Sequence, residues 1–224
     1  MKISLIIPVY NEAGTIGQCL ANLEALEGAA EILFADGGST DGTLERLNGR
    51  AVVRCPKGRA RQMNAAARQS GGDVLWFSHC DSVLPRDGLK QIEEAAERGA
   101  QFGCFLIGFD YQGPFMGCNT ALSNLRSKLW HIAFGDQGMF MTRELFLEAG
   151  GFPELPIMED YEFSRRMKRA GVPLQVLPGR IVTSGRRYRT GRPLRTMWQM
   201  FWLRCLYRAG ADIHEIARRY RDIR

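Results

Sequence analysis

The 224-residue sequence lacks the features that mark several large protein classes. It has no uninterrupted apolar run approaching the ~18 residues that a membrane-spanning helix needs. Its apolar start, from Ile3 to Val9, follows a single Lys and runs directly into Asn11-Glu12, which is unlike a signal peptide. We therefore expect a cytoplasmic protein, with the inner face of the membrane as an alternative location.

Two nucleotide-binding signatures and the usual cysteine pairs are also missing. The chain contains neither G-x-G-x-x-G nor G-x-x-x-x-G-K-[ST], which argues against a dehydrogenase and against a P-loop NTPase. Its six cysteines include no C-x-x-C pair. We therefore expect reduced, mostly buried thiols instead of a disulfide framework or a zinc site.

Acidic residues are absent from a long stretch of the C-terminal third. Twelve Lys or Arg and no Asp or Glu lie between Phe163 and Ala211, which leaves 18 basic and 24 acidic residues elsewhere. A basic segment joined to an acidic body suggests an anionic partner, such as a diphosphate or a lipid head group. A solvated basic surface is the alternative. We expect no nucleic acid partner, because the rest of the chain is acidic.

The residues that are present predict one α/β domain. Apolar runs at Ile3–Val9, 32–35, 51–54 and 74–78 alternate with helical patterns, which indicates parallel strands with helices on both faces. The polar clusters at 10–12, 36–38 and 79–81 each follow a strand and should share one rim of the sheet. Farther along, 173–177 and 181–183 are predicted as two short strands.

Four motifs then resemble family-2 glycosyltransferases of the GT-A fold. They are IIPVYNE at 6–12, ADGGSTDGT at 35–43, FSHCDS at 77–82, and GGF at 150–152 followed by Glu159-Asp160. Each motif alone is weak, but four in the right order carry the resemblance over roughly residues 3–170. The short length suggests a compact bacterial branch. The resemblance implies a GT-A fold, with a Rossmann-like mixed sheet and helices on both faces.

The resemblance also implies where the donor binds. Pro8, Tyr10, Glu12 and Asp36 occupy positions that hold the base and ribose of a nucleoside diphosphate sugar in the family. A carboxylate can accept hydrogen bonds from a base or a ribose, and an aromatic ring can stack on a base. Core packing of Tyr10 is the alternative. Gly37 stands where the family carries a second Asp.

The third motif implies a metal site at Asp81. In the family this slot usually carries D-x-D, and Mn²⁺ or Mg²⁺ held there neutralises the leaving diphosphate. His79 replaces the first Asp, and it either binds the metal or contacts the donor ribose. A turn-capping role for Asp81 is the alternative.

Two further groups of residues are expected to bind the donor. Arg59 and Gln62 share a helix face after Gly58 and would line the donor pocket, unless they form a solvated first turn. Arg186 and Arg187 lie in the basic segment and would bind the diphosphate, because Arg binds phosphate in a bidentate manner.

The acceptor side is expected around Glu159-Asp160. In the family, the Asp of this pair takes the proton of the acceptor hydroxyl, so Asp160 and its neighbour Glu159 are the catalytic candidates. Both could instead be helix caps matched to the helix dipole. Asp136 and Gln137 should bind hydroxyl groups of the acceptor.

The sequence therefore predicts an inverting, metal-assisted glycosyltransferase. Residues 1–185 would form the GT-A domain, with a nucleotide half at about 1–100 and an acceptor half at about 101–185. Residues 186–224 would form a basic helical extension, whose aromatic helix either packs on the core or contacts a membrane. The hydroxyl acceptor could be lipid-linked. The alternative functions are a sugar nucleotidyltransferase and a non-catalytic membrane- or anion-binding module.

Overall fold

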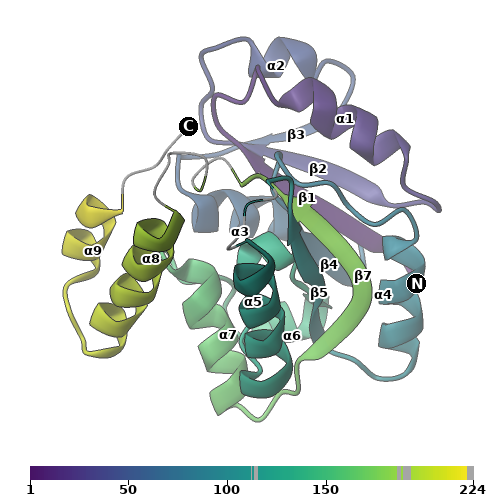
Figure 1. The fold of residues 1–224 in the computed structure, drawn as a ribbon. Helices are drawn as coiled ribbons and strands as arrows, with labels where there is room; N and C mark the ends of the chain where they lie inside the picture. Colours follow the sequence, from purple (N-terminus) through teal and green to yellow (C-terminus); the bar gives the residue numbers. More distant parts are fainter. Residues whose placement is uncertain (112, 114–115, 186–187, 189–192, 221–224) are drawn as a thin grey trace.

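A computed structural model of the chain describes residues 1–111, 113, 116–185, 188 and 193–220. Within these residues, seven strands form one mixed sheet with the order β3-β2-β1-β4-β6-β5-β7 (Figure 1). The strands are β1 (Ile3–Val9), β2 (Glu31–Asp36), β3 (Ala51–Arg54), β4 (Val74–Phe77), β5 (Phe102–Phe109), β6 (Phe140–Thr142) and β7 (Gln175–Thr183).

Helices cover both faces of the sheet, as the sequence predicts. They are α1 (Ile16–Glu24), α2 (Thr43–Arg46), α3 (Arg59–Gln69), α4 (Gly88–Glu97), α5 (Met116–Trp130), α6 (Arg143–Glu148), α7 (Glu159–Arg169), α8 (Pro193–Arg208) and α9 (Ile213–Arg219), with a short 3-10 helix η1 (Gly135–Gln137). Apolar side chains of α3, α6 and α7 pack on one face, and those of α1 and α4 pack on the other. Alternate residues of β1 divide between these two layers, because successive strand side chains point to opposite faces.

The strand directions bring the predicted polar clusters to one rim. β1 is parallel to β2 and β4, and β2 is parallel to β3. β6 is antiparallel to both β4 and β5, and β7 is parallel to β5. All strands except β6 therefore end on the same side of the sheet.

The short β6 leaves a gap in the sheet beside β5. On its β5 side, β6 pairs only with Phe102 and Gly103, so the second half of β5 has no neighbouring strand on that side within the described residues. The Asn124 side chain of α5 fills this gap by accepting from the Ile107 N–H at 2.8 Å and donating to the Ile107 carbonyl at 3.1 Å. Gln137 of η1 also donates to the Phe105 carbonyl of β5, so both α5 and η1 pack against this strand.

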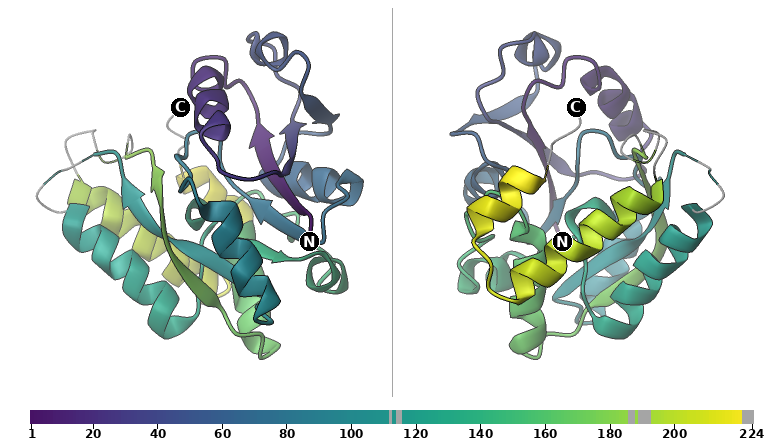
Figure 2. Two further views of the ribbon diagram at one scale, coloured as in Figure 1. Left: turned by 90° about the vertical axis from the view of Figure 1, so that its right-hand side faces the viewer. Right: turned by 60° about the vertical axis from the view of Figure 1, so that its left-hand side comes forward.

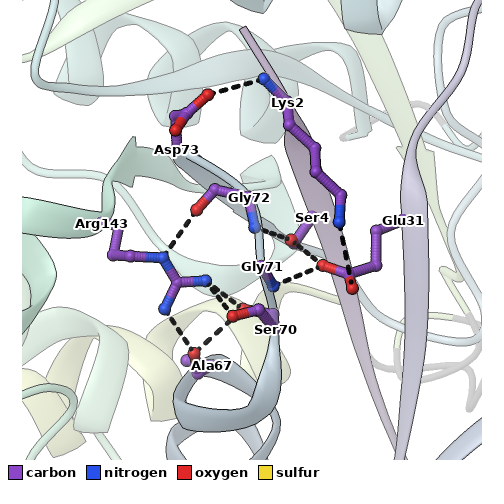
Figure 3. Close-up of polar contacts among 9 residues, drawn as sticks. All are labelled: Lys2, Ser4, Glu31, Ala67, Ser70, Gly71, Gly72, Asp73 and Arg143. Carbon is purple, nitrogen blue, oxygen red and sulfur yellow. Dashed lines mark hydrogen bonds and ion pairs between the residues drawn. The ribbon is translucent and has the colours of Figure 1, made fainter.

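At the opposite end of the sheet, side chains fix the turn between α3 and β4 (Figure 3). Arg143 donates to the backbone carbonyls of Ala67, Ser70 and Gly72. On the other side of the turn, Glu31 accepts from the Gly71 N–H at 2.7 Å. These bonds link α6, α3 and β2, and so they hold the start of β4 in register beneath the rim.

The prediction of two short strands at 173–177 and 181–183 is wrong. The segment forms the single strand β7, whose register against β5 shifts between Phe105 and Leu106. Pro178 and Gly179 lie at this irregularity, where a proline needs no ladder partner. The Gly179 N–H is satisfied by the Gln91 side chain at 2.8 Å.

Helices α8 and α9 lie together at one side of the molecule, outside the layers of the sheet (Figures 1 and 2). Leu203 of α8 and Ile216 of α9 pack with Ile157, which precedes α7. Most of the predicted apolar face of α8 is not covered: Trp198 is 64% exposed, Phe201 48% and Trp202 49%. No helix of the described residues is both long enough and apolar enough to span a bilayer.

Candidate functional site

A cavity of about 1030 Å³ opens at the rim where the parallel strands end. Its wall is formed by the ends of β1, β4 and β7, the starts of α3 and α7, and one side of α5 and α8. Nine of the residues predicted for the site line it: Pro8, Tyr10, Glu12, Arg59, Gln62, His79, Asp81, Asp136 and Asp160. Residues separated by 150 positions in the sequence therefore meet in one space.

The loops after β1 and β2 are fastened to each other at one end of the cavity. The Asn11 N–H donates to Ser39 Oγ at 2.9 Å, and Asn11 Oδ1 accepts from the Thr40 N–H at 2.9 Å. The Glu12 N–H donates to Thr43 Oγ1 at 2.8 Å. These bonds fix the backbone that carries Tyr10 and Glu12. The Lys57 ammonium lies 3.9 Å from the centre of the Tyr10 ring, and both line the cavity.

Asp36 shapes this end of the site from outside the cavity wall. Its side chain is buried, and it accepts from the N–H groups of Gly38 and Ser39 at 3.0 to 3.2 Å. The structure therefore places Asp36 as a brace of the turn after β2, behind the residues that face the cavity.

Gln62 lines the cavity, but its amide is bonded to the backbone. Nε2 donates to the carbonyls of Val9 and Ala35, both at 2.8 Å, and so it ties the ends of β1 and β2 to α3. Gly37 leaves room for this amide, because a Cβ there would lie 3.1 Å from Gln62 Cδ. The glycine that departs from the family pattern is thus matched to Gln62.

His79 and Asp81 follow β4 at the middle of the cavity. Burial lowers the pKa of His79 to about 4, with Arg59 acting in the same direction and Asp81 and Asp160 opposing. The imidazole is therefore neutral at neutral pH. In the described part of the chain, no cluster of three or more His, Cys, Asp or Glu could hold a metal ion. A site of this kind fits Mg²⁺ or Mn²⁺ only if substrate phosphates and water complete the coordination.

Asp160 lies at the start of α7, next to His79. Its Oδ2 accepts from the Gly135 N–H at 2.7 Å, and its Oδ1 accepts from the Tyr161 N–H at 2.6 Å. A Cβ at Gly135 would lie 3.0 Å from His79 Nε2 and 3.1 Å from Asp160 Oδ2, so these two atoms are at most about 6 Å apart. Gly135 thus lets the strand-end side chains and the α7 carboxylate approach each other.

Glu159 points away from the cavity, although it is adjacent to Asp160. Its carboxylate is 2% exposed and forms an ion pair with Arg59 Nε at 2.5 Å. Burial raises the pKa of Glu159, and the Arg59 guanidinium opposes that shift. Neighbouring helix residues point in different directions, so one carboxylate anchors α7 to α3 while the other faces the cavity.

The side chains of Asp136 and Gln137 also point in different directions. Asp136 lines the cavity, and its buried Oδ1 has no hydrogen-bond partner among the residues that the structure describes. Burial raises its pKa to about 6, against the influence of Arg126. Gln137 is fully buried outside the cavity and is bonded to Ser127, Phe105, Phe134 and Arg126. Gln137 therefore does not face the cavity.

The predicted Arg186 and Arg187 lie outside the described residues. Ser184 and Tyr188, on either side of them, line the cavity. The lining residues that were not predicted include Arg126 of α5, Phe134, and Arg204 of α8. The sequence placed Arg204 in a helix that either packs on the core or contacts a membrane, and no motif connects it with the other two.

Comparisons with known proteins bear on the family and the fold of the chain. The model of the family described as Glycosyl transferase family 2 matches residues 4–148. The chain is 33% identical over 97 residues to the uncharacterized glycosyltransferase YfnE of Bacillus subtilis (strain 168), a match that covers 39% of this chain and 25% of YfnE. The chain thus spans about a quarter of that relative.

Two solved structures share the fold. The mannosyltransferase PcManGT from Pyrobaculum calidifontis, in complex with GDP-Man and Mn²⁺, matches with a TM-score of 0.63 and 24% identity over 81% of this chain and 56% of its own. S. aureus TarS 1–349, in complex with UDP-GlcNAc, matches with a TM-score of 0.66 and 20% identity over 82% of this chain and 58% of its own. These matches confirm the predicted GT-A architecture.

Proposed function

Because this chain belongs to glycosyl transferase family 2, we propose that it transfers a sugar from a nucleoside diphosphate sugar to an acceptor hydroxyl, with inversion at the anomeric carbon. The observation that carries the proposal is the meeting of two groups in one cavity. His79 and Asp81 come from the end of β4, and Asp160 comes from the start of α7. The proximity of His79 and Asp160 at Gly135 suits a reaction in which donor and acceptor lie side by side.

The donor would occupy the end of the cavity formed by β1, β4 and α3. Tyr10, Glu12 and Pro8 would contact the nucleoside from the loop that is fastened to Ser39 and Thr43. Gln62 and Asp36 would act indirectly, by holding the strand ends and the turn on which the nucleoside rests. Arg59 would contribute positive charge while it also neutralises Glu159. Arg186 and Arg187 remain candidates for the diphosphate.

Asp81 would hold the metal, with His79 beside it. The Mn²⁺ in the PcManGT complex supports this assignment, and so does the position of the Asp81 carboxylate in the lining of the cavity. A cation bound there supplies neutralisation of the charge that develops on the leaving diphosphate. Mn²⁺ suits a site with a neutral imidazole better than Mg²⁺ does.

Asp160 would be the base, because it lines the same cavity as Asp81 and its Oδ2 lies at most about 6 Å from His79 Nε2. The acceptor hydroxyl would give its proton to Asp160 as its oxygen bonds to the anomeric carbon, and the nucleoside diphosphate would leave from the opposite face. The buried, unpartnered Oδ1 of Asp136 would accept a hydrogen bond from an acceptor hydroxyl. Glu159 would act only by holding α7 against Arg59.

The test begins with binding. Calorimetry with UDP, GDP and dTDP, each with and without Mn²⁺, should find one nucleotide that binds more tightly with the metal. Asp81→Asn should abolish that metal-dependent gain, while the control Asp87→Asn, an exposed position at the start of α4, should retain it. If no nucleotide showed metal-dependent affinity, the donor assignment would be wrong. The anomeric configuration of the product, measured by NMR, then tests inversion.

We also propose that the C-terminal extension contacts a membrane surface. The supporting observation is the exposure of Trp198, Phe201 and Trp202 on a helix from a segment rich in basic residues. Aromatic and basic side chains on one helix suit an anionic bilayer interface. Trp198→Ala with Trp202→Ala should reduce co-sedimentation with vesicles that contain anionic lipid. Equal co-sedimentation of the wild-type protein and the double variant would contradict this contact.

A further inference from the structure

Two arginines form a positively charged wall in the acceptor half of the cavity. Arg126 of α5 lies with its guanidinium carbon 3.6 Å from the centre of the Phe134 ring, and that of Arg204 of α8 lies 5.4 Å from the same ring. Both arginines are half-buried and line the cavity. Phe134 thus holds two cations close together at a place where ligands have access.

These arginines differ from several other arginines of the chain in how their charge is balanced. Several others form ion pairs with a carboxylate: Arg59 with Glu159, Arg61 with Glu154, and Arg165 with Glu162. Among the described residues, Arg126 donates only to neutral oxygens, the Ile132 carbonyl at 3.3 Å and Gln137 Oε1 at 2.7 Å. No hydrogen bond or ion pair of Arg204 is formed within the same residues. Two partly buried positive charges therefore lack a directly bonded anion in the part of the chain that the structure describes.

A third donor faces the same space. Asn119 lines the cavity, and its buried Nδ2 has no hydrogen-bond partner among the described residues. Asn119, Ser123 and Arg126 are spaced by four and three residues, so they share one face of α5, and all three line the cavity. A buried amide without a partner costs free energy that a ligand oxygen would offset.

The location points to the acceptor and not to the leaving diphosphate. The carboxylates that act most strongly on the Arg126 guanidinium are Asp136 and then Asp160, and Asp136 also acts on Arg204. These are the residues to which the proposed function assigns the acceptor hydroxyl. The donor residues Tyr10 and Glu12 belong to the loop after β1, whereas the arginines come from α5 and α8.

The mouth of the cavity next to these arginines is apolar. Leu122, Leu125 and Trp130 of α5, together with Leu194, Trp198 and Phe201 of α8, line the same cavity, and each is about half exposed or more. Exposed apolar side chains that continue into a charged pocket fit a molecule with an apolar part and a charged part.

We propose that the acceptor is an anionic amphiphile, whose phosphate or carboxylate group is bound by Arg126, Arg204 and Asn119 and whose apolar part lies on the rim formed by α5 and α8. This proposal rests on the proposed function, because it identifies the acceptor of the same site. A planar guanidinium pair suits both anions, since each Arg can bind two of their oxygens. The anionic group would place the acceptor hydroxyl beside Asp160.

The binding of simple probes tests the proposal without turnover. Trp130 and Trp198 line the mouth, so their fluorescence reports its occupation. Octyl phosphate should bind at least tenfold more tightly than octanol, which lacks the anion, and more tightly than inorganic phosphate, which lacks the apolar part. Equal affinities for octyl phosphate and octanol would overturn the anion site. Equal affinities for octyl phosphate and inorganic phosphate would overturn the apolar rim.

Variants identify the residues that bind the probe. Arg204→Gln should weaken octyl phosphate binding about tenfold and leave octanol binding unchanged, and it removes no hydrogen bond from the described structure. The matched control is Arg208→Gln, which lies one turn later on α8, is exposed, and does not line the cavity. Arg126→Lys should give a smaller loss, because it keeps the charge but not the bidentate geometry. Equal effects of the Arg204 and Arg208 variants would contradict the proposal.

A separate measurement distinguishes this proposal from the donor assignment. The affinity of the metal-bound nucleoside diphosphate should be unchanged in Arg204→Gln. If that affinity fell while octyl phosphate binding remained, the arginines would serve the donor, and the acceptor proposal would be wrong. If no nucleotide bound at all, the proposed function would fail independently of the result with octyl phosphate.

Discussion

Replacement of Arg59 by Ala should destabilise the protein, because it leaves Glu159 as an uncompensated charge. Removing one partner of a buried ion pair typically costs about 3–5 kcal/mol. Glu159 is 2% exposed, but Arg59 is 40% exposed, so water can approach the vacated side and the expected loss is about 2–3 kcal/mol. For a chain of this size, that corresponds to a melting temperature lower by roughly 5–10 °C.

The loss should depend on pH in a defined direction. Burial raises the pKa of Glu159 and Arg59 is the largest influence that lowers it, so the substitution raises this pKa further. A carboxyl whose folded pKa is raised binds a proton in the folded state that the unfolded chain has already lost. The penalty is therefore complete only at a pH above the raised pKa and shrinks as the pH falls toward the usual Glu value of 4.5.

Urea unfolding at pH 7 and pH 5 measures both effects. Arg61→Ala is the matched control, because Arg61 lies on the same helix and pairs with Glu154 in an ion pair that is about half exposed on both sides. Such a surface pair is worth about 0–1 kcal/mol. The double variant Arg59→Ala with Glu159→Gln should recover part of the loss at pH 7. Equal losses for Arg59→Ala and Arg61→Ala at both pH values would refute the reasoning.

Three other predictions concern the cavity. Gly135→Ala should lower kcat by roughly 10- to 100-fold with an unchanged melting temperature, because its Cβ would displace His79 or Asp160; wild-type kcat would show that the contact is tolerated. Gln62→Ala should cost about 2 kcal/mol in urea unfolding, since the carbonyls of Val9 and Ala35 each lose one donor; a change below about 0.5 kcal/mol would mean that water replaces the amide. Asp136→Asn and His79→Gln should change the pH dependence of unfolding in opposite directions. The pKa of Asp136 is raised from 3.8 to about 6, so it lowers stability as the pH rises through that window, and the Asn variant should gain relative to wild type. The pKa of His79 is lowered from 6.5 to about 4, so it adds stability as the pH rises, and the Gln variant should lose that gain. In metal-free buffer, each variant's free energy of unfolding should differ from that of wild type by about 2–3 kcal/mol over its pH window. Parallel plots of stability against pH for the two variants would contradict the opposite pKa shifts of Asp136 and His79.

The rim of the sheet could be predicted from the sequence because it depends on short local patterns. Each of β1, β2 and β4 ends directly before a polar cluster, and parallel strands bring their ends together. This was enough to place Tyr10, His79 and Asp81 around one cavity. It was not enough to assign contacts, because adjacent residues can point in different directions. Glu159 and Gln137 are buried, whereas their neighbours Asp160 and Asp136 face the cavity.

The cavity wall that contains Arg126, Phe134 and Arg204 could not be predicted, because it depends on packing between segments that are distant in the sequence. Arg126, Phe134 and Arg204 come from α5, the turn before η1, and α8, with no motif among them. The exposure of Trp198 on α8 was equally hidden, because an apolar helix face in a sequence looks the same whether it is covered or bare. The continuous β7 was missed because proline and glycine in its middle resemble a strand end.

The role of Asp160 is the central claim, and one pair of measurements on Asp160→Asn tests it most directly. Transfer should be followed as the acceptor-dependent release of nucleoside diphosphate, and donor binding should be measured by calorimetry on the same preparation. We expect kcat to fall by about 10²- to 10⁴-fold, the usual contribution of a general base, while donor affinity stays near that of wild type. Transfer at a rate close to wild type would contradict the assignment of Asp160 as the base.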